Sequence, residues 1–444
     1  MIHPVTQWLF GRPRAAQGEV LAALDIGSSK IACFIARADG DGPPRVIGIG
    51  HQLAEGMRNG AVVNIEALQQ AISSTVATAE HMSGETIQRV IVNISGAQLV
   101  SQTATIELPL HGREVTDSDL HRIMAQGHIM APEDAQGHAL ELIHVLPVGY
   151  ALDHQKGIRE PVGMIGHMLQ AQIHLISAAF GPVRTLATAI ARCHLDVEKL
   201  VAAPYASGLA CLVEDEMDLG SLIIDMGAGT TSFAVFFEGH AVYTDGIPIG
   251  GAHVTSDIAR GLTTSLVHAE RLKTLYGNAL SGAMDSREII DVPQIGEEAP
   301  EHANHIPKSQ LVGIIQPRLE EIFELVRSRL EKSGFSDIAG RRVVLTGGAS
   351  QLPGVRELAQ KVLDKQVRLG RPLRVARTSP SGGRSKGASL TGLAEATSGP
   401  AFATTAGLLA AALQPEMAAP GRFGELVSSG AMLSRIGQWI RQNM

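Results

Sequence analysis

Two short segments about two hundred residues apart carry the same pattern. Residues 23–30 read Ala-Leu-Asp-Ile-Gly-Ser-Ser-Lys, and residues 223–231 read Ile-Ile-Asp-Met-Gly-Ala-Gly-Thr-Thr. In each segment an apolar run ends at an aspartate, a polar turn follows, and apolar residues then alternate along the chain. Alternation on both sides of a tight turn predicts a strand, a hairpin and a second strand. Because each hairpin opens one half of the chain, the repeat favours a fold built from two related halves.

The two turns have the composition of phosphate-binding loops. Glycines let the backbone approach a ligand closely, and hydroxyl groups add donors to the backbone N–H groups. One carboxylate per turn, from Asp25 and Asp225, suits a hydrated Mg²⁺ that bridges phosphate oxygens across a cleft. We expect both carboxylates to be exposed, since they lie at turns. The predicted phosphate-binding residues are Gly27, Ser28, Ser29, Lys30, Gly227, Ala228, Gly229, Thr230 and Thr231.

Length and composition limit the class of protein. A chain of 444 residues predicts two to four compact units. The formal charge of −7 gives no electrostatic footprint for nucleic acid, so no nucleic-acid partner is expected. Three scattered cysteines form no disulfide framework or zinc spacing, which favours a reducing cytosol. We find no apolar run long enough to predict a membrane span.

Residues 20–95 and the chain after residue 175 alternate strands and helices, with helices expected at 65–80, 181–193 and 311–333. The stretch 98–174 interrupts this rhythm with short strands and one helix that Thr116 can cap. It predicts a small separate insertion. Another capped helix is expected to begin at Thr255.

A second glycine-rich feature suggests an adenosine site. The apolar run 343–346 ends at Gly347, Gly348 and Ala349, and ligands in α/β sheets lie beyond the carboxyl ends of strands. A plain strand-to-helix turn would look the same, but the two aspartate hairpins favour a purine lying on bare backbone. Gly250 and Gly251 follow another predicted strand and are assigned to the same site.

Glu270 and Lys273 lie three residues apart on one predicted helix face. Taken alone, they are best explained as a surface ion pair. In a nucleotide site, the carboxylate would accept hydrogen bonds from ribose hydroxyls, and the lysine stem would cover the purine.

The end of the chain predicts an amphipathic helix after a linker rich in proline and glycine. One side of this helix is an apolar stripe, and the opposite side is polar and carries Arg435 and Arg441. Helices that lie on an anionic membrane surface have this pattern. A helix docked on the body or on a second subunit is the alternative. The predicted membrane-binding residues are Met432, Leu433, Ile436, Trp439 and Ile440.

Taken together, these motifs resemble the actin superfold, with connecting helices at residues 205–208 and 404–409. Segments 24–30, 157–163, 269–277 and 345–349 narrow the resemblance to the FtsA family of bacterial cell-division proteins, over nearly the whole chain from residue 21. The insertion falls where that family carries its extra subdomain.

The resemblance implies an α/β, actin-like (ribonuclease H-like, duplicated) ATPase fold with two lobes around a nucleotide cleft. The expected parts are subdomain 1A (20–97, 175–212 and 376–413), the inserted subdomain 1C (98–174), subdomain 2A (213–252 and 331–375), subdomain 2B (253–330), a linker (414–430) and the terminal helix (431–444).

The resemblance also implies ATP and Mg²⁺ as cofactors, and self-assembly into filaments. The protein would tether the ring protein FtsZ to the inner face of the cytoplasmic membrane at the septum. The C-terminal peptide of FtsZ would bind at Arg318 and Glu321, which otherwise form a surface pair, and later division proteins would bind the inserted subdomain. A small-molecule kinase of the same superfold and a pilus-assembly platform remain alternatives, and the terminal helix favours the division scaffold over both.

The sequence differs from that of actin at positions that matter for ATP hydrolysis. Actin has a glutamine that helps to place the attacking water a few residues before its Tyr-Ala-Ser-Gly. Residues 199–203 here read Lys-Leu-Val-Ala-Ala, so at most slow hydrolysis of ATP is expected and no catalytic residue is assigned.

Overall fold

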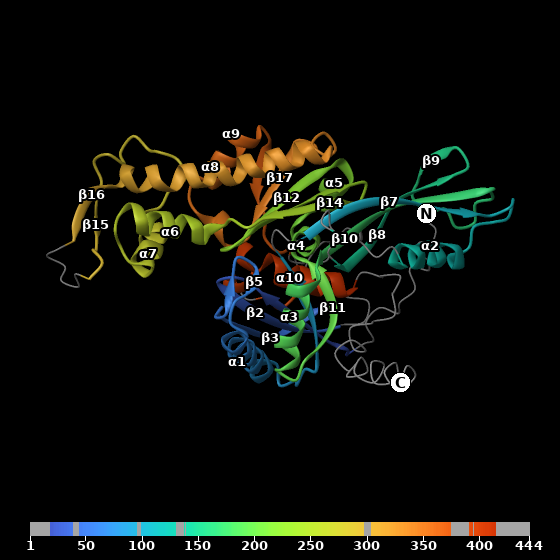
Figure 1. The fold of residues 1–444 in the computed structure, drawn as a ribbon, viewed down its shortest axis with the longest axis horizontal. Helices are drawn as coiled ribbons and strands as arrows, with labels where there is room; N and C mark the ends of the chain where they lie inside the picture. Colours follow the sequence, from blue (N-terminus) through green and yellow to red (C-terminus); the bar gives the residue numbers. More distant parts are fainter. Residues whose placement is uncertain are drawn as a thin grey trace, which may run out of the picture.

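The computed structural model describes residues 18–38, 44–95, 99–129, 137, 139–296, 303–373, 390–393 and 395–413. The predicted linker at 414–430 and the predicted terminal helix at 431–444 lie outside these residues. The described chain forms two lobes, each built on a five-stranded sheet, with a third sheet at one side (Figure 1). Within the described residues, no helix is both long enough and apolar enough to span a membrane.

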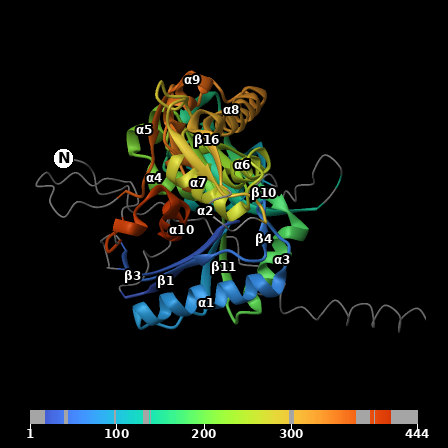
Figure 2. The same cartoon turned by 90° about the vertical axis from the view of Figure 1, so that its left-hand side faces the viewer.

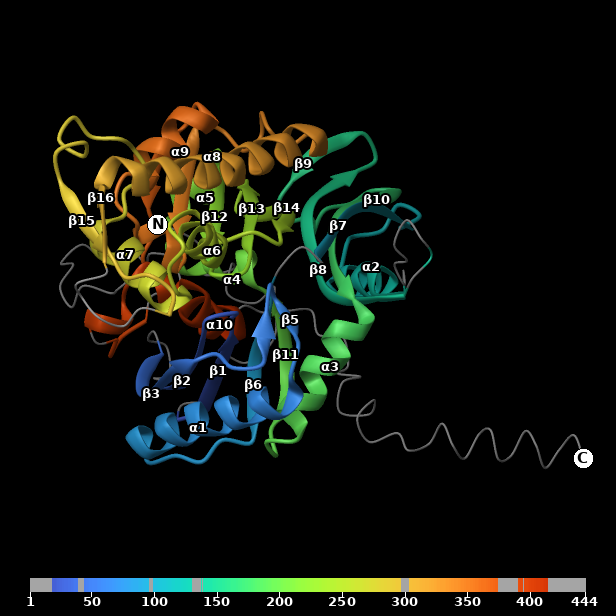
Figure 3. The ribbon, with the colours of Figure 1, turned by 60° about the vertical axis from the view of Figure 1, so that its left-hand side comes forward.

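The first lobe contains the first predicted hairpin, and its sheet has the order β11-β6-β1-β2-β3. The strands are β1 (Val20–Ile26), β2 (Lys30–Arg37), β3 (Arg45–Leu53), β6 (Arg89–Ile94) and β11 (Asp196–Ala202). The helices α1 (Ile65–Ser83) and α3 (Phe180–Ala191) cover the outer face of this sheet (Figures 2 and 3). The predicted helices at 65–80 and 181–193 are therefore present.

The second lobe repeats this arrangement, with the order β14-β13-β12-β17-β18. Its strands are β12 (Ser221–Met226), β13 (Thr231–Phe237), β14 (His240–Ile247), β17 (Arg342–Thr346) and β18 (Gln366–Leu369). In both sheets a central strand pairs antiparallel with the next strand and parallel with a later one. The duplication that the two hairpins predict is confirmed.

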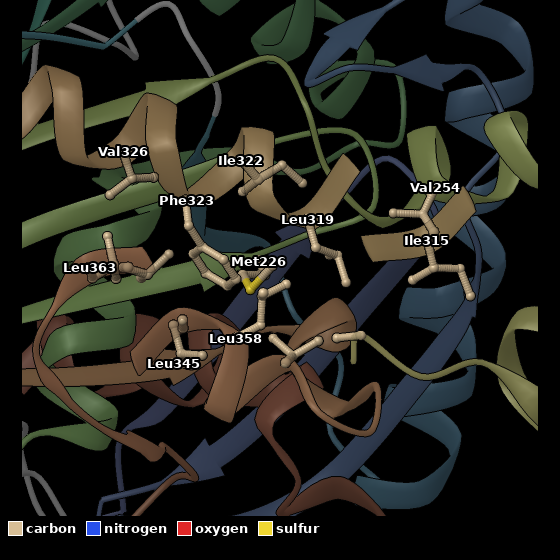
Figure 4. Packing of buried hydrophobic residues seen from close by; sticks show 14 of the residues in the cluster. Met226, Val254, Ile315, Leu319, Ile322, Phe323, Val326, Leu345, Leu358 and Leu363 are labelled. Carbon is tan, nitrogen blue, oxygen red and sulfur yellow. The ribbon is translucent and has the colours of Figure 1, made fainter. Parts of the chain in front are cut away.

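A long helix covers the outer face of the second sheet. Leu319, Phe323 and Val326 of α8 (Lys308–Ser333) are buried and face Met226, Leu345 and α9 (Val355–Leu363), as Figure 4 shows. The apolar residues that face the sheet recur every three or four positions, so one stripe of the helix is buried.

Next to α8 lie α6 (Gly251–Gly261), α7 (Leu266–Tyr276) and a small sheet of β15 (Ile289–Val292) and β16 (Asn304–Pro307). The predicted start of a helix at Thr255 is wrong, because α6 begins at Gly251. The Thr255 hydroxyl instead donates to the Gly251 carbonyl within the helix, at 3.1 Å.

Two buried helices join the lobes. α4 (Ala203–Cys211) and α10 (Ala403–Leu413) lie between the two sheets (Figure 3), and residues of both lobes share one apolar cluster with them. The helices meet closely at Gly407, where an added Cβ would lie 1.9 Å from the Ala206 carbonyl oxygen. Only a residue without a side chain allows this approach.

The insertion forms a four-stranded sheet of its own, with the order β7-β10-β8-β9. Its elements are β7 (Leu99–Pro109), α2 (Asp117–Ile129), β8 (Leu140–Leu152), β9 (Gln155–Ile158) and β10 (Met168–Ala179). Ile123 of α2 and Leu169 of β10 belong to a separate apolar cluster. The expected boundary at residue 174 falls inside β10, which continues for five further residues.

Two buried histidines dock the insertion on both lobes. His144 of β8 accepts a hydrogen bond from the Ala202 N–H at 3.0 Å, just before α4. His174 of β10 lies 2.8 Å from the Ala241 carbonyl of β14 and 2.6 Å from the Ser101 hydroxyl of β7. Burial lowers the pKa of His174 to about 4. The neutral ring is therefore the form that the folded protein holds at neutral pH.

Replacing Gly407 by alanine should lower the free energy of unfolding by about 3 kcal/mol, because the new methyl group meets backbone atoms that cannot move aside independently. Denaturant titration of the purified variant measures this loss. Gly313→Ala on α8 is the matched control, since its added Cβ would meet no atom within 4 Å. It should be neutral or stabilising by up to about 1 kcal/mol, because alanine favours the helix. Equal stability of the two variants would contradict the close approach.

Acidification should destabilise the protein through His174. The unfolded chain takes up a proton near pH 6.5, whereas folded His174 does so only near pH 4. Stability from the neutral ring is therefore complete above pH 6.5 and falls by about 2 kcal/mol between pH 7.5 and pH 5. His174→Gln should lose less stability than the wild type over this interval, and His81→Gln, on the exposed side of α1, should lose the same as the wild type. If His174→Gln lost as much stability as the wild type between pH 7.5 and pH 5, the ring of His174 would be protonated readily in the folded protein.

Candidate functional site

Asp25 and Asp225 occupy equivalent positions, one residue before the end of the central strands β1 and β12. Their exposed fractions are only 7% and 8%, so the expectation of exposed turn carboxylates is wrong. Both residues still belong to strands, and the connecting helices cover the strand ends. The repeat in the sequence does not reveal this cover, because the covering helices lie outside both hairpins: α4 ends at Cys211, before the second hairpin, and α10 begins at Ala403.

Hydroxyl groups of the connecting helices hold both carboxylates. The Ser207 hydroxyl of α4 donates to Asp225 Oδ2 at 2.6 Å, and the Thr404 hydroxyl of α10 donates to the same oxygen at 2.7 Å. The Thr405 hydroxyl donates to Asp25 Oδ2 at 2.8 Å. Ser207 and Thr404 also lie 3.0 Å apart. Buried charges require such partners, because removing them from water is costly.

Burial, hydroxyl donors and one lysine act on the charge of the two carboxyl groups. Burial raises the pKa of Asp25 and of Asp225, and the hydroxyl donors act in the opposite direction by stabilising the charged forms. Lys30 also lowers both pKa values, while its own pKa is lowered by burial. The Lys30 ammonium contacts the Ala401 carbonyl and lies 3.7 Å from the centre of the Phe402 ring.

The two hairpin turns have the same backbone geometry and meet each other. In each, the first glycine N–H donates to a carbonyl three residues later at 2.9 Å, from Gly27 to Lys30 and from Gly227 to Thr230. An added Cβ at Gly229 would lie 2.6 Å from the Ser28 hydroxyl, so the turns of the two lobes are in contact. Ser28 Oγ also accepts from the Gly60 N–H at 2.9 Å.

A cavity of about 570 Å³ lies between the lobes and is lined by residues of both hairpins. Both predicted aspartates and fourteen of the sixteen predicted cofactor-binding residues line this cavity. The two that do not are Thr231 and Gly250. The lining residues that were predicted are Asp25, Gly27, Ser28, Ser29, Lys30, Asp225, Gly227, Ala228, Gly229, Thr230, Gly251, Glu270, Lys273, Gly347, Gly348 and Ala349.

Thr231 and Gly250 support the wall from behind. The Thr231 hydroxyl donates to the Ile249 carbonyl at 2.8 Å, and an added Cβ at Gly250 would lie 2.5 Å from the Gly227 carbonyl oxygen. These two residues fix the second hairpin against the start of α6.

Glu270 and Lys273 form an ion pair at 2.7 Å, and both line the cavity. The Lys273 ammonium also donates to the Gly251 carbonyl at 3.1 Å and to the Thr255 hydroxyl at 2.8 Å. The pair therefore connects α7 to α6 and also lines the cavity, so it is not an isolated surface ion pair.

Gly347 closes the cavity next to Asp225. Its φ of 84° lies in the left-handed region, and an added Cβ would lie 2.4 Å from Asp225 Oδ1. Only glycine satisfies both requirements without strain. The Gly-Gly pair after β17 thus brings bare backbone up to the carboxylate.

Arg318 and Glu321 lie on α8 and do not line the cavity. Arg318 donates to both oxygens of Asp257 on α6, at 2.5 and 3.2 Å, and also contacts Glu321. Arg318 therefore joins α6 to α8, in addition to forming the surface pair expected from the sequence.

Several polar residues of the site carry no clear signal in the sequence pattern. Asn93 lines the cavity, and its side chain accepts from the Ile26 N–H at 2.7 Å, which fixes β6 against the end of β1. The sequence places Ser207, Thr404 and Thr405 on the connecting helices but does not indicate a role for their hydroxyl groups. The sequence offers one signal for them. Each hydroxyl residue lies in a helix of mostly small residues that follows a strand or a loop.

Two lobes of the same topology, joined by crossing helices and with paired carboxylates at the cavity between them, define the actin-like ATPase fold. A solved structure described as "PilM-PilN type IV pilus biogenesis complex" shares this fold, with a TM-score of 0.60, 18% identity, and coverage of 90% of this chain and 100% of that chain.

Sequence comparisons identify the family. Residues 222–407 match the family "Cell division protein FtsA", and residues 96–177 match "SHS2 domain inserted in FTSA". The cell division protein FtsA of Rhizobium meliloti is 41% identical over 454 aligned residues, covering 98% of each chain. The FtsA of Pseudomonas aeruginosa is 33% identical over 433, covering 96% of this chain and 98% of the relative. The chain belongs to the FtsA family of cell division proteins, and the expected family and fold are confirmed.

Proposed function

We propose that this chain is an ATP-binding, filament-forming scaffold that tethers the FtsZ ring to the inner face of the cytoplasmic membrane at the division septum. The observation that carries the proposal is the meeting of both hairpins, with their buried carboxylates, at one cavity between the lobes. The kinase and pilus-platform alternatives are not favoured, because the family relationship covers nearly the whole chain.

The residues at the cavity fit Mg²⁺ and a nucleoside triphosphate. The hydroxyl bonds occupy the Oδ2 atoms of Asp25 and Asp225, which leaves the Oδ1 atoms for a hydrated cation. The turn N–H and hydroxyl groups would hold phosphate oxygens, and the cation would screen the charge between phosphates and carboxylates. Glu270 and Lys273 would contact the ribose and purine, with Gly347 and Gly348 beneath the base.

We propose slow ATP hydrolysis at most. Ala203, at the start of α4, lines the cavity in the region where actin carries its water-orienting glutamine. A methyl group cannot hold an attacking water. The side chain of Asn93, which also lines the cavity, is engaged by the backbone of Ile26.

Contacts with partners are assigned to surfaces outside the cavity. Glu321 is 48% exposed, so it can accept a hydrogen bond from the C-terminal peptide of FtsZ while Arg318 remains bound to Asp257. Later division proteins would contact the inserted subdomain, where Ile165 is 72% exposed. The apolar stripe of Met432, Leu433, Ile436, Trp439 and Ile440 would hold the protein on anionic lipid.

Asp225→Asn should lower the ratio of the ATP affinity in Mg²⁺ to the ATP affinity in EDTA by about 10-fold or more, because the cation loses one charged ligand. The nucleotide-free protein should stay folded, since an amide keeps the shape of a buried carboxylate. Equilibrium titration with ATP in Mg²⁺ and in EDTA measures the effect. Asp285→Asn, at another buried aspartate beside Lys308 at the start of α8, is the control and should bind like the wild type. Unchanged Mg²⁺ dependence in folded Asp225→Asn would contradict the metal assignment.

The scaffold function is tested by recruitment of a labelled FtsZ C-terminal peptide to anionic vesicles by the full chain with Mg²⁺ and ATP. Trp439→Glu should release both the protein and the peptide from the vesicles, because a charge enters the apolar stripe. Glu321→Arg should leave the protein on the vesicles and lose the peptide. Glu331→Arg, on an exposed part of the same helix, should retain both.

Two results would contradict the proposal. Peptide recruitment by the Trp439→Glu variant would show that the terminal helix is not the anchor. Loss of ATP binding in that variant would show that the helix is part of the folded body instead.

A further inference from the structure

The hydroxyl groups at the two carboxylates come from helices that join the lobes, and they are distributed unevenly. Thr404 and Thr405 are neighbours in the first turn of α10, yet Thr404 contacts Asp225 of the second lobe and Thr405 contacts Asp25 of the first. Ser207 of α4 adds a second donor to Asp225. One helical turn therefore connects the carboxylates of both lobes.

We propose that Ser207, Thr404 and Thr405 are positioning residues that orient Asp25 and Asp225 toward a shared divalent cation and make this orientation depend on the crossing of α4 and α10. The inference rests on the proposed binding of Mg²⁺ and ATP, and it assigns a role to hydroxyl groups that bind the carboxylates. Thr404 also lines the cavity, whereas Ser207 and Thr405 are not among its lining residues.

The geometry supports orientation over simple satisfaction of buried groups. The donors to each carboxylate bind a single oxygen of it, at 2.6 to 2.8 Å: Ser207 and Thr404 share one oxygen of Asp225, and Thr405 binds one oxygen of Asp25. The second oxygen of each carboxylate is left for the cation. On the opposite side, the backbone at Gly347 leaves no space for a methyl group near Asp225 Oδ1. Asp225 is thus fixed between two hydroxyls and bare backbone, and it has little freedom to rotate.

The crossing of the helices sets the distance between these donors. Gly407 lies one helical turn after Thr404, and its close approach to Ala206 brings Ser207 next to Thr404, at 3.0 Å between hydroxyl oxygens. If one lobe rotated against the other, either Asp225 or Asp25 would move relative to the first turn of α10, which carries Thr404 and Thr405. Both carboxylates keep their bonds only while the helices keep this crossing.

The test compares ATP affinity with Mg²⁺ and with EDTA in Ser207→Ala, Thr404→Val and Thr405→Val. Loss of a residue that orients a metal ligand typically reduces metal affinity by 10- to 100-fold, so the ratio of the two affinities should fall by about 10-fold in each variant. Affinity in EDTA should not change. Thr404→Ser and Thr405→Ser should restore the ratio, because they keep the hydroxyl.

The matched control is Thr75→Val on α1, a fully buried threonine whose hydroxyl donates only to the Ala71 carbonyl. It should keep the wild-type ratio. A double mutant makes the assignment specific: Thr405→Val should add no further loss in an Asp25→Asn background, whereas Thr404→Val should add one.

The outcomes separate the inference from the proposed function. A wild-type protein that binds ATP equally with and without Mg²⁺ would overturn the metal assignment and the inference with it. Mg²⁺-dependent binding by the wild type, with the same ratio in folded Thr404→Val and Thr405→Val, would overturn the inference alone. An equal loss of affinity with Mg²⁺ and with EDTA would also overturn it, since it would indicate a merely structural role. If a valine variant does not fold, the alanine variant at that position gives the same comparison.

Discussion

The close crossing of α4 and α10 is the constraint on which the two lobes and their cavity depend. Gly407 lets the helix backbones touch at Ala206, and apolar residues of both sheets pack around the pair. The lobes are thus joined through a buried core instead of a flexible hinge alone. The same crossing positions the hydroxyls that bind the two carboxylates. The packing of the lobes and the geometry of the carboxylates therefore both depend on these two helices.

Burial of Asp25 and Asp225 explains why the site needs so many polar partners. Burial favours the neutral form of a carboxyl group, and the pKa values of both residues stay raised although hydroxyl groups donate to them. Hydroxyls and Lys30 offset part of this cost, and the remaining charge would be balanced by a cation. The two carboxylates are therefore held in place by hydrogen bonds within the protein itself.

The inserted subdomain is coupled to this arrangement by position. His144 contacts the backbone directly before α4, and His174 contacts β14 of the second lobe. The insertion has its own apolar cluster, yet it rests on both lobes. A change in the angle between the lobes would have to break or shift one of these contacts, which gives the insertion a physical link to the cavity.

The sequence by itself determined the duplicated hairpins, the helices with a clear apolar stripe, the insertion and the glycine-rich and hydroxyl-rich turns that line the cavity, because strand alternation, helix periodicity and turn composition are local properties. It did not determine the burial of Asp25 and Asp225, the roles of Ser207, Thr404 and Thr405, or the contact between Arg318 and Asp257. These depend on residues up to 380 positions apart, such as Asp25 and Thr405, which only the tertiary structure brings together. A local pattern identifies a carboxylate at the end of a strand, but the helices that cover it come from elsewhere in the chain.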